Sequence, residues 1–198
     1  YFYYNDLPVN APITKLRVDA PGSPERVKAF EKNTEGRYPA MSNFSFDYGN
    51  VHITCLDSNP YANPLDRDLL LWLVNDLKNS KADWKIVAYH HPAFNTSISH
   101  YDDQQMRLLA PILEEQKVDL VLSGHVHNYQ RSFPLKFELK LDSTGTHYVV
   151  SPEGRVDGTF TLDQKFDGVT NTRPDGVIYI VSGSGGARLY DAPLTDNP

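Results

Sequence analysis

The sequence has little cysteine, no long apolar run and no concentration of basic residues. Cys55 is the only cysteine among 198 residues, so neither an intrachain disulfide nor a thiolate metal site can form. In VHITC we expect it to act as a small apolar residue on a buried strand. No apolar run approaches the roughly 20 residues of a membrane-spanning helix, so we expect no membrane span. The net charge of −6, without a Lys/Arg cluster, argues against nucleic acid as a partner.

The start of the chain also lacks features. It begins YFYYNDLP, with neither an initiator Met nor a signal-type segment. We therefore expect a piece of a longer protein, whose targeting signal lies outside this sequence. The 198 residues are nevertheless enough for one domain with a sizeable core, and 40% of them are hydrophobic.

The pattern changes along the chain, and we divide it into four parts. Residues 1–40 form an irregular lead-in with one short helix at 24–33, and residues 41–132 alternate strands with helices. Residues 133–176 carry short alternating runs rich in Gly, Thr and Asp, which predict an antiparallel β insertion. Residues 177–198 hold a final buried strand and a tail.

The part from 41 to 132 has the order of an α/β core. Two strand-like runs meet at Gly49–Asn50, which predicts a hairpin. The apolar residues after Asp66 recur with a helical period, which predicts a helix, and Asp66 is the candidate cap at its start. A second helix at 102–118 must kink or split at Pro111, which has no amide donor. It joins strands at 84–90 and 118–123, which the handedness rule makes parallel.

Histidines follow both of these strands. VDLVLSGHVH predicts a strand buried on both faces that ends at Gly124, with His125 and His127 projecting to the same side. KIVAYHHP delivers His90 and His91, and His100 follows in the next loop. Because sites in open α/β sheets form at the carboxyl ends of the strands, we expect these five histidines at one edge as a metal site. The other two histidines, His52 and His147, are interpreted as structural or surface residues.

Two segments carry a resemblance to a family. HHPAFNTSISHY and GHVHNYQR resemble the calcineurin-like metallophosphoesterase superfamily, and most closely the purple acid phosphatases. The likeness extends through SFDYGNVHITCLDSN and VIYIVSGSGGARLY, so that it covers about residues 40 to 190. It implies an α/β fold that forms the C-terminal half of a four-layer αββα sandwich, with the β insertion added to it.

The resemblance also implies roles for individual residues. His90 and His125 would bind one metal ion and His127 the other. His100 would hydrogen-bond a phosphate oxygen and protonate the leaving alkoxide. The residues implied to support the site or the substrate are His91, Tyr129 and Arg131.

The family's earlier motifs are absent from this sequence. They supply an aspartate ligand, a Gly-Asp pair with the bridging aspartate, a tyrosine, and Gly-Asn-His. Asp47 and Tyr48 lie where the family has an ordinary strand, and the spacing of Asp57, Asp102 and Asp103 does not single them out as replacement ligands. We therefore expect this chain alone to be inactive, and its apolar sheet edge to be covered by a missing N-terminal half or by another copy.

The function implied by the resemblance is hydrolysis of a small phosphate ester by a two-metal centre, with ions drawn from Fe, Zn and Mn. An extracellular or periplasmic address is implied in the same way. One alternative is a mononuclear zinc hydrolase with His90, His125, His127 and water as ligands. The other is a non-catalytic domain that retains the fold.

Overall fold

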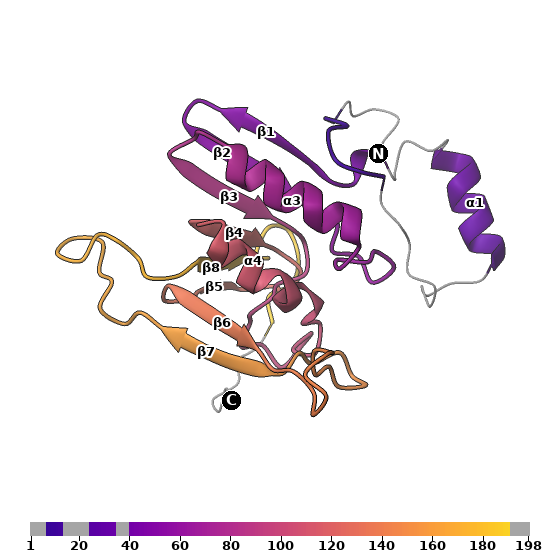
Figure 1. The fold of residues 1–198 in the computed structure, drawn as a ribbon. Helices are drawn as coiled ribbons and strands as arrows, with labels where there is room; N and C mark the ends of the chain where they lie inside the picture. Colours follow the sequence, from indigo (N-terminus) through magenta and orange to yellow (C-terminus); the bar gives the residue numbers. More distant parts are fainter. Residues whose placement is uncertain (1–6, 14–23, 35–39, 191–198) are drawn as a thin grey trace.

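The computed structural model describes residues 7–13, 24–34 and 40–190 (Figure 1). The rest of the irregular lead-in and the end of the tail lie outside the described residues. The helices are α1 Pro24–Thr34, α3 Arg67–Asn79, the 3₁₀ helix η1 Gln105–Leu109 and α4 Ala110–Glu115. The strands are β1 Phe44–Tyr48, β2 Val51–Cys55, β3 Trp84–Ala88, β4 Leu120–Ser123, β5 Tyr129–Arg131, β6 Leu135–Leu139, β7 Gly158–Leu162 and β8 Ile178–Ser182.

Six strands form one mixed sheet in the order β1-β2-β3-β4-β8-β5. The four central strands β2, β3, β4 and β8 are parallel, and the edge strands β1 and β5 are antiparallel to their neighbours. β1 and β2 form the predicted hairpin, and Gly49 at its turn has a φ of +61°, which glycine adopts without strain. The predicted α/β class with parallel central strands is confirmed.

Helix α3 begins and packs as its sequence predicts. The Asp66 carboxylate accepts hydrogen bonds from the amides of Asp68 and Leu69, which satisfies two donors of the first turn. Leu73 and Leu77, one turn apart, are fully buried. Removing a leucine of this kind from water stabilises the fold by about 1.5–3 kcal/mol. The stripe therefore fixes α3 against the sheet.

The second predicted helix is split near Pro111, as expected. The 3₁₀ helix η1 ends at Leu109, and α4 starts at Ala110 with Pro111 in its first turn. A proline is tolerated there because the first amides of a helix have no partner within it. The junction buries Met106 and Leu109 against the sheet.

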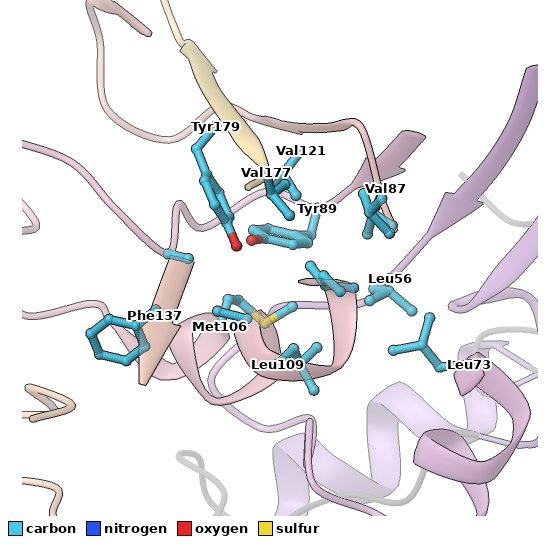
Figure 2. Close-up of a cluster of buried hydrophobic side chains, with 14 of the residues drawn as sticks. Leu56, Leu73, Val87, Tyr89, Met106, Leu109, Val121, Phe137, Val177 and Tyr179 are labelled. Atoms are coloured by element: carbon cyan, nitrogen blue, oxygen red, sulfur yellow. The ribbon is translucent and has the colours of Figure 1, made fainter. Parts of the chain in front are cut away.

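The core lies between these helices and one face of the sheet (Figures 1 and 2). Val87 and Val121 project into it from neighbouring strands and are at most 1% exposed. Tyr89 and Tyr179 lie beside them, with their hydroxyl groups side by side (Figure 2). Neither hydroxyl has a hydrogen-bond partner among the residues that the structure describes, and burial raises the pKa of both side chains.

The opposite face of the sheet corrects one prediction. The strand expected at 118–123 starts at Leu120, and Leu122 is 39% exposed, so this strand is not buried on both faces. Side chains alternate along a strand, and α3 and α4 cover only the face to which Val121 points. Trp84, in the same sheet, is 53% exposed. Cys55 is half-buried, and burial raises the pKa of its thiol.

The insertion contains the expected antiparallel pair, β6 and β7. Phe137 of β6 packs its ring edge against Phe94, and its amide donates to the Glu114 carboxylate of α4. An isolated bridge between Leu135 and Val177 connects the pair to the main sheet. In the described part of the chain, no helix is long and apolar enough to cross a membrane.

Candidate metal centre

The carboxyl ends of β3 and β4 bring two histidines together. Ala88 and Leu122 are paired in register, so His90 and His125 leave the sheet at the same edge. The Gly124 amide donates to the His90 carbonyl over 3.0 Å, which continues the pairing beyond the strands. His90 Nε2 and His125 Nδ1 then lie 3.1 Å apart.

His91 joins this pair, although neighbours on a strand point to opposite faces. The strand has ended at Ala88, and the chain bends at both histidines. The centre of the His91 ring lies 4.4 Å from that of His125 and 4.9 Å from that of His90. Ser58 Oγ lies 3.0 Å from His91 Nδ1 and accepts the His91 backbone N–H. Burial, followed by the charges of His125 and His90, lowers the pKa of His91 to about 4.

A carboxylate lies between His100 and His125. One oxygen of Asp103 is 3.2 Å from His100 Nδ1 and 3.2 Å from His125 Nε2. Burial, followed by the charge of His100, lowers the pKa of His125, so its neutral form is favoured. His100 and His125 have φ angles of +61° and +62°. Such left-handed conformations are uncommon outside glycine, and they concentrate at functional sites.

His127 lies beside this cluster and is held separately. Its Nδ1 is 2.9 Å from the Arg188 carbonyl oxygen, so Nδ1 carries the proton and donates it. Its ring stacks on Tyr190 with 4.4 Å between centres, and the Tyr190 hydroxyl is 3.1 Å from His100 Nε2. A histidine that donates one ring N–H to a carbonyl leaves its other nitrogen free for a metal ion.

The donor set fits a transition-metal ion. His90, His91 and His125 form one group whose ligand atoms lie within 4.8 Å of one another, and His100, Asp103 and His125 form a second. Two nitrogens on one tetrahedral zinc ion, each about 2.0–2.1 Å from it, are about 3.4 Å apart. The 3.1 Å between His90 and His125 is close to that spacing. Imidazole nitrogens suit zinc, iron and manganese alike.

Other predicted site residues lie outside these groups. Tyr129, 65% exposed, and Arg131 lie on β5 at the edge of the sheet. Arg131 lines a separate hollow of about 330 Å³. Among the aspartates considered as ligands, Asp57 accepts hydrogen bonds from Asn59, and Asp102 pairs with Arg155.

The two histidines predicted to be structural or surface residues have those positions. His52 is buried on β2, with Nδ1 2.7 Å from Asp47 and Nε2 2.9 Å from Asp76. His147 is exposed in a turn, 3.4 Å from Asp142. Neither belongs to the groups that could hold a metal ion.

The sequence analysis missed two residues that contact the histidines, and it did not select Asp103 as a ligand. Tyr190 contacts both His100 and His127, and Ser58 holds His91. A signal existed for Tyr190: it follows β8, which is parallel to β4 and ends at the same edge. No signal in the sequence pointed to Asp103, because an acid three residues after a histidine in a loop is also a common surface pattern.

A mostly parallel α/β sheet with clustered imidazoles at its carboxyl edge is an arrangement that could hold metal ions. The chain belongs to the calcineurin-like phosphoesterase family, whose match covers residues 7–129. This match confirms the resemblance found in the sequence.

The relatives include plant purple acid phosphatases. Over 117 residues, 56% of this chain, the sequence is 35% identical to purple acid phosphatase 21 of Arabidopsis thaliana. Over 176 residues, 86% of this chain, it is 30% identical to purple acid phosphatase 13 of the same plant. The chain spans 26% of the length of each of these curated relatives.

A solved structure shares the fold. It is the purple acid phosphatase PPD1 from yellow lupin (Lupinus luteus) seeds, with a TM-score of 0.53 and 19% identity. The match covers 79% of this chain and 25% of that one. At this identity the likeness concerns the fold alone.

Proposed function

We propose that this chain supplies the later histidine ligands of a two-metal centre that hydrolyses small phosphate esters. The observation that carries the proposal is the 3.1 Å approach of His90 Nε2 to His125 Nδ1 at the carboxyl edge of the sheet. These two imidazoles would hold one ion. His127 would hold the second through Nε2, because its Nδ1–H donates to the Arg188 carbonyl.

Metal ions held by these histidines, drawn from Fe, Zn and Mn, would supply the positive charge that orients a phosphate and lowers the pKa of a bound water. His100 is the general acid in this proposal. Asp103 accepts from its Nδ1, and its Nε2, which would carry the transferred proton, lies 3.1 Å from the Tyr190 hydroxyl. Water would lose one proton to the solvent, and the resulting hydroxide oxygen would add to phosphorus while the bond to the ester oxygen breaks and that oxygen takes the His100 proton. His91, Tyr129 and Arg131 are proposed to support the site.

The carboxylates that bridge and balance two cations would come from outside these 198 residues. Two neighbouring cations repel each other strongly unless an anionic ligand lies between them. The exposed sheet face with Trp84 and Leu122 offers a place for a further segment or another copy to pack. We therefore propose that the 198 residues alone hydrolyse no phosphate ester at a measurable rate.

A mononuclear zinc hydrolase is the second candidate, and one observation favours it. His90, His91 and His125 place three imidazoles around one point, the number of protein ligands that a catalytic zinc site uses. In this version His91 takes the place that the sequence assigned to His127.

Metal analysis of the active protein distinguishes the two candidates. Two ions per active molecule, together with hydrolysis of nitrophenyl phosphate, support the two-metal centre. One zinc ion supports the mononuclear site. A folded, full-length protein that hydrolyses no phosphate ester with any of these metals would support the non-catalytic alternative.

A further inference from the structure

A cavity of about 660 Å³ opens beside the histidine cluster. Its walls are the segment 60–65 after β2, the loop 102–105 after β3, and the loop 150–156 of the insertion. His91 and Asp103 belong both to the cavity lining and to the groups that could hold a metal ion. A molecule bound at the cluster would therefore extend into this cavity, whose volume is typical of small-molecule sites.

The insertion loop is fastened to the loop that carries Asp103. Arg155 forms an ion pair with Asp102, and its guanidinium lies 5.3 Å from the centre of the Tyr101 ring. The Val156 amide donates to Gln104, which is 2% exposed, over 3.0 Å. These contacts hold the third wall of the cavity in place.

Gly154 in this wall lies close to the backbone of Asp102. Its φ is +100°, and a Cβ at this position would lie 2.9 Å from the Asp102 carbonyl oxygen. A side chain there would force the two loops apart. The insertion is thus shaped to meet the loop 102–105.

One buried polar side chain is shared by the cavity lining and the histidine cluster. His91 is 9% exposed and lines the cavity. Its Nδ1 lies 3.0 Å from Ser58 Oγ, and the residue belongs to the group of histidines that could hold a metal ion. His91 therefore links the cavity directly to the histidine cluster.

The carboxylates that line the cavity make its charge negative. Asp102, Asp103 and Glu153 line the cavity, and none of the described lining residues is Lys or Arg. Asp102 is paired with Arg155, and Asp103 with two histidines. The Ser151 hydroxyl lowers the pKa of Glu153, which is therefore ionised at neutral pH. Most of the remaining wall is apolar, with Pro60, Pro64, Leu65, Leu108, Val150, Pro152 and Val156.

We propose that this cavity binds the leaving-group part of the substrate and selects a small alkyl alcohol that carries an ammonium group. This inference rests on the proposed phosphoesterase function, because that function places the reacting phosphate beside the cavity. The apolar wall receives the alkyl part, and Glu153 attracts the cation. An anionic leaving group is repelled by the same carboxylates.

Binding can be measured without any catalysis. Choline is the cationic probe, glycerol the neutral one and glycolate the anionic one, each titrated into the 198-residue chain while amide resonances are followed by NMR. We expect saturable shifts at Leu65, Gly154 and Val156 with choline, weaker ones with glycerol, and none there with glycolate.

The matched variants are Glu153→Lys and Glu138→Lys. Glu138 is an exposed acid on β6 that does not line the cavity. Removing a favourable charge near the surface and adding a repulsive one should weaken choline binding about fivefold or more in Glu153→Lys, and leave it unchanged in Glu138→Lys. Equal shifts with choline and glycolate, no shifts with choline, or insensitivity to Glu153→Lys would each overturn the proposal.

Turnover by the full-length protein separates this inference from the proposed function. We expect kcat/KM for choline phosphate to exceed that for phosphoglycolate, and Glu153→Lys to remove the difference. Turnover of both esters at equal rates would refute the selection by the cavity and leave the phosphoesterase function standing. Choline binding without turnover of any ester would support the selection by the cavity and refute the phosphoesterase function.

Discussion

His90 Nε2 lies 3.1 Å from His125 Nδ1, although 35 positions separate the two residues in the chain. The parallel register of β3 and β4 produces this contact, because it brings Ala88 beside Leu122 and lets both strands end at one edge. Two imidazole nitrogens at that distance can share one hydrogen bond when one of them carries a proton. Their spacing suits a shared metal ion, and the predictions on function start from it.

Replacing His125 or His127 by Ala should remove metal from the full-length protein and lower phosphatase activity by several orders of magnitude. Each change opens a coordination position of the proposed two-ion geometry. The measurements are metal content by mass spectrometry and turnover of nitrophenyl phosphate. His147→Ala is the control, since His147 is exposed in a turn outside the groups that could hold a metal. Unchanged metal and rate in either variant would remove that residue from the ligand set.

Replacing His100 by Ala should leave the metal content intact and lower kcat by about 10²–10⁴, the range for losing a general acid. The loss should be smaller for nitrophenyl phosphate than for an alkyl phosphate, because nitrophenolate leaves without a proton. Steady-state kinetics with both esters test this. An equal loss for the two would mean that His100 binds the phosphate and does not protonate the leaving group.

Glu114→Gln should stabilise the fold at pH 7. Burial raises the pKa of Glu114, so its ionised form is penalised in the folded state, while its carboxylate still accepts the Phe137 amide. A raised folded-state pKa means that the folded chain binds its proton at higher pH than the unfolded chain. The penalty is therefore present above that pKa and is relieved as pH falls through it.

Urea unfolding of the Glu114→Gln variant at several pH values tests whether the substitution stabilises the fold. The urea midpoint should be higher than in the unaltered chain at pH 7, and the difference should shrink toward pH 4. Glu115→Gln, a change at the exposed neighbour, should have no such effect. A destabilisation by Glu114→Gln at pH 7 would show that the charged hydrogen bond outweighs the cost of burial.

The exposed sheet face should make the isolated chain self-associate. Trp84 is 53% and Leu122 39% exposed on the face opposite α3 and α4. Substituting both by Gln should reduce association in sedimentation velocity without a loss of helical signal. Leu71→Gln is the matched control, because Leu71 is 52% exposed on α3. Association that persists in the double variant would locate the contact elsewhere.

The fold and the general position of the site could be predicted from the sequence, because both follow from local patterns. The apolar stripe of α3, the glycine turn at Gly49, the split at Pro111 and the parallel strands are each set by a few neighbouring residues. From those strands it follows that His90 and His125 meet.

The details that escaped prediction depend on contacts between distant segments. Tyr190 reaches His100 across 90 positions, and Ser58 reaches His91 across 33. The exposure of Leu122 depends on which sheet face the helices cover, and an apolar run by itself does not reveal this. The approach of His91 to the cluster depends on the direction of a bend after β3, and Pro92 predicts the end of the strand but not that direction.

The most direct test of the central claim is to measure turnover of nitrophenyl phosphate by the full-length protein before and after metal removal, beside the 198-residue chain. We expect hydrolysis by the full-length protein, loss of activity on removing the metal, recovery when Zn, Fe or Mn is returned, and no measurable hydrolysis by the 198-residue chain. Hydrolysis that survives complete metal removal would contradict the metal-dependent function that we propose. Equal rates for the two proteins would show that these 198 residues already contain the whole site.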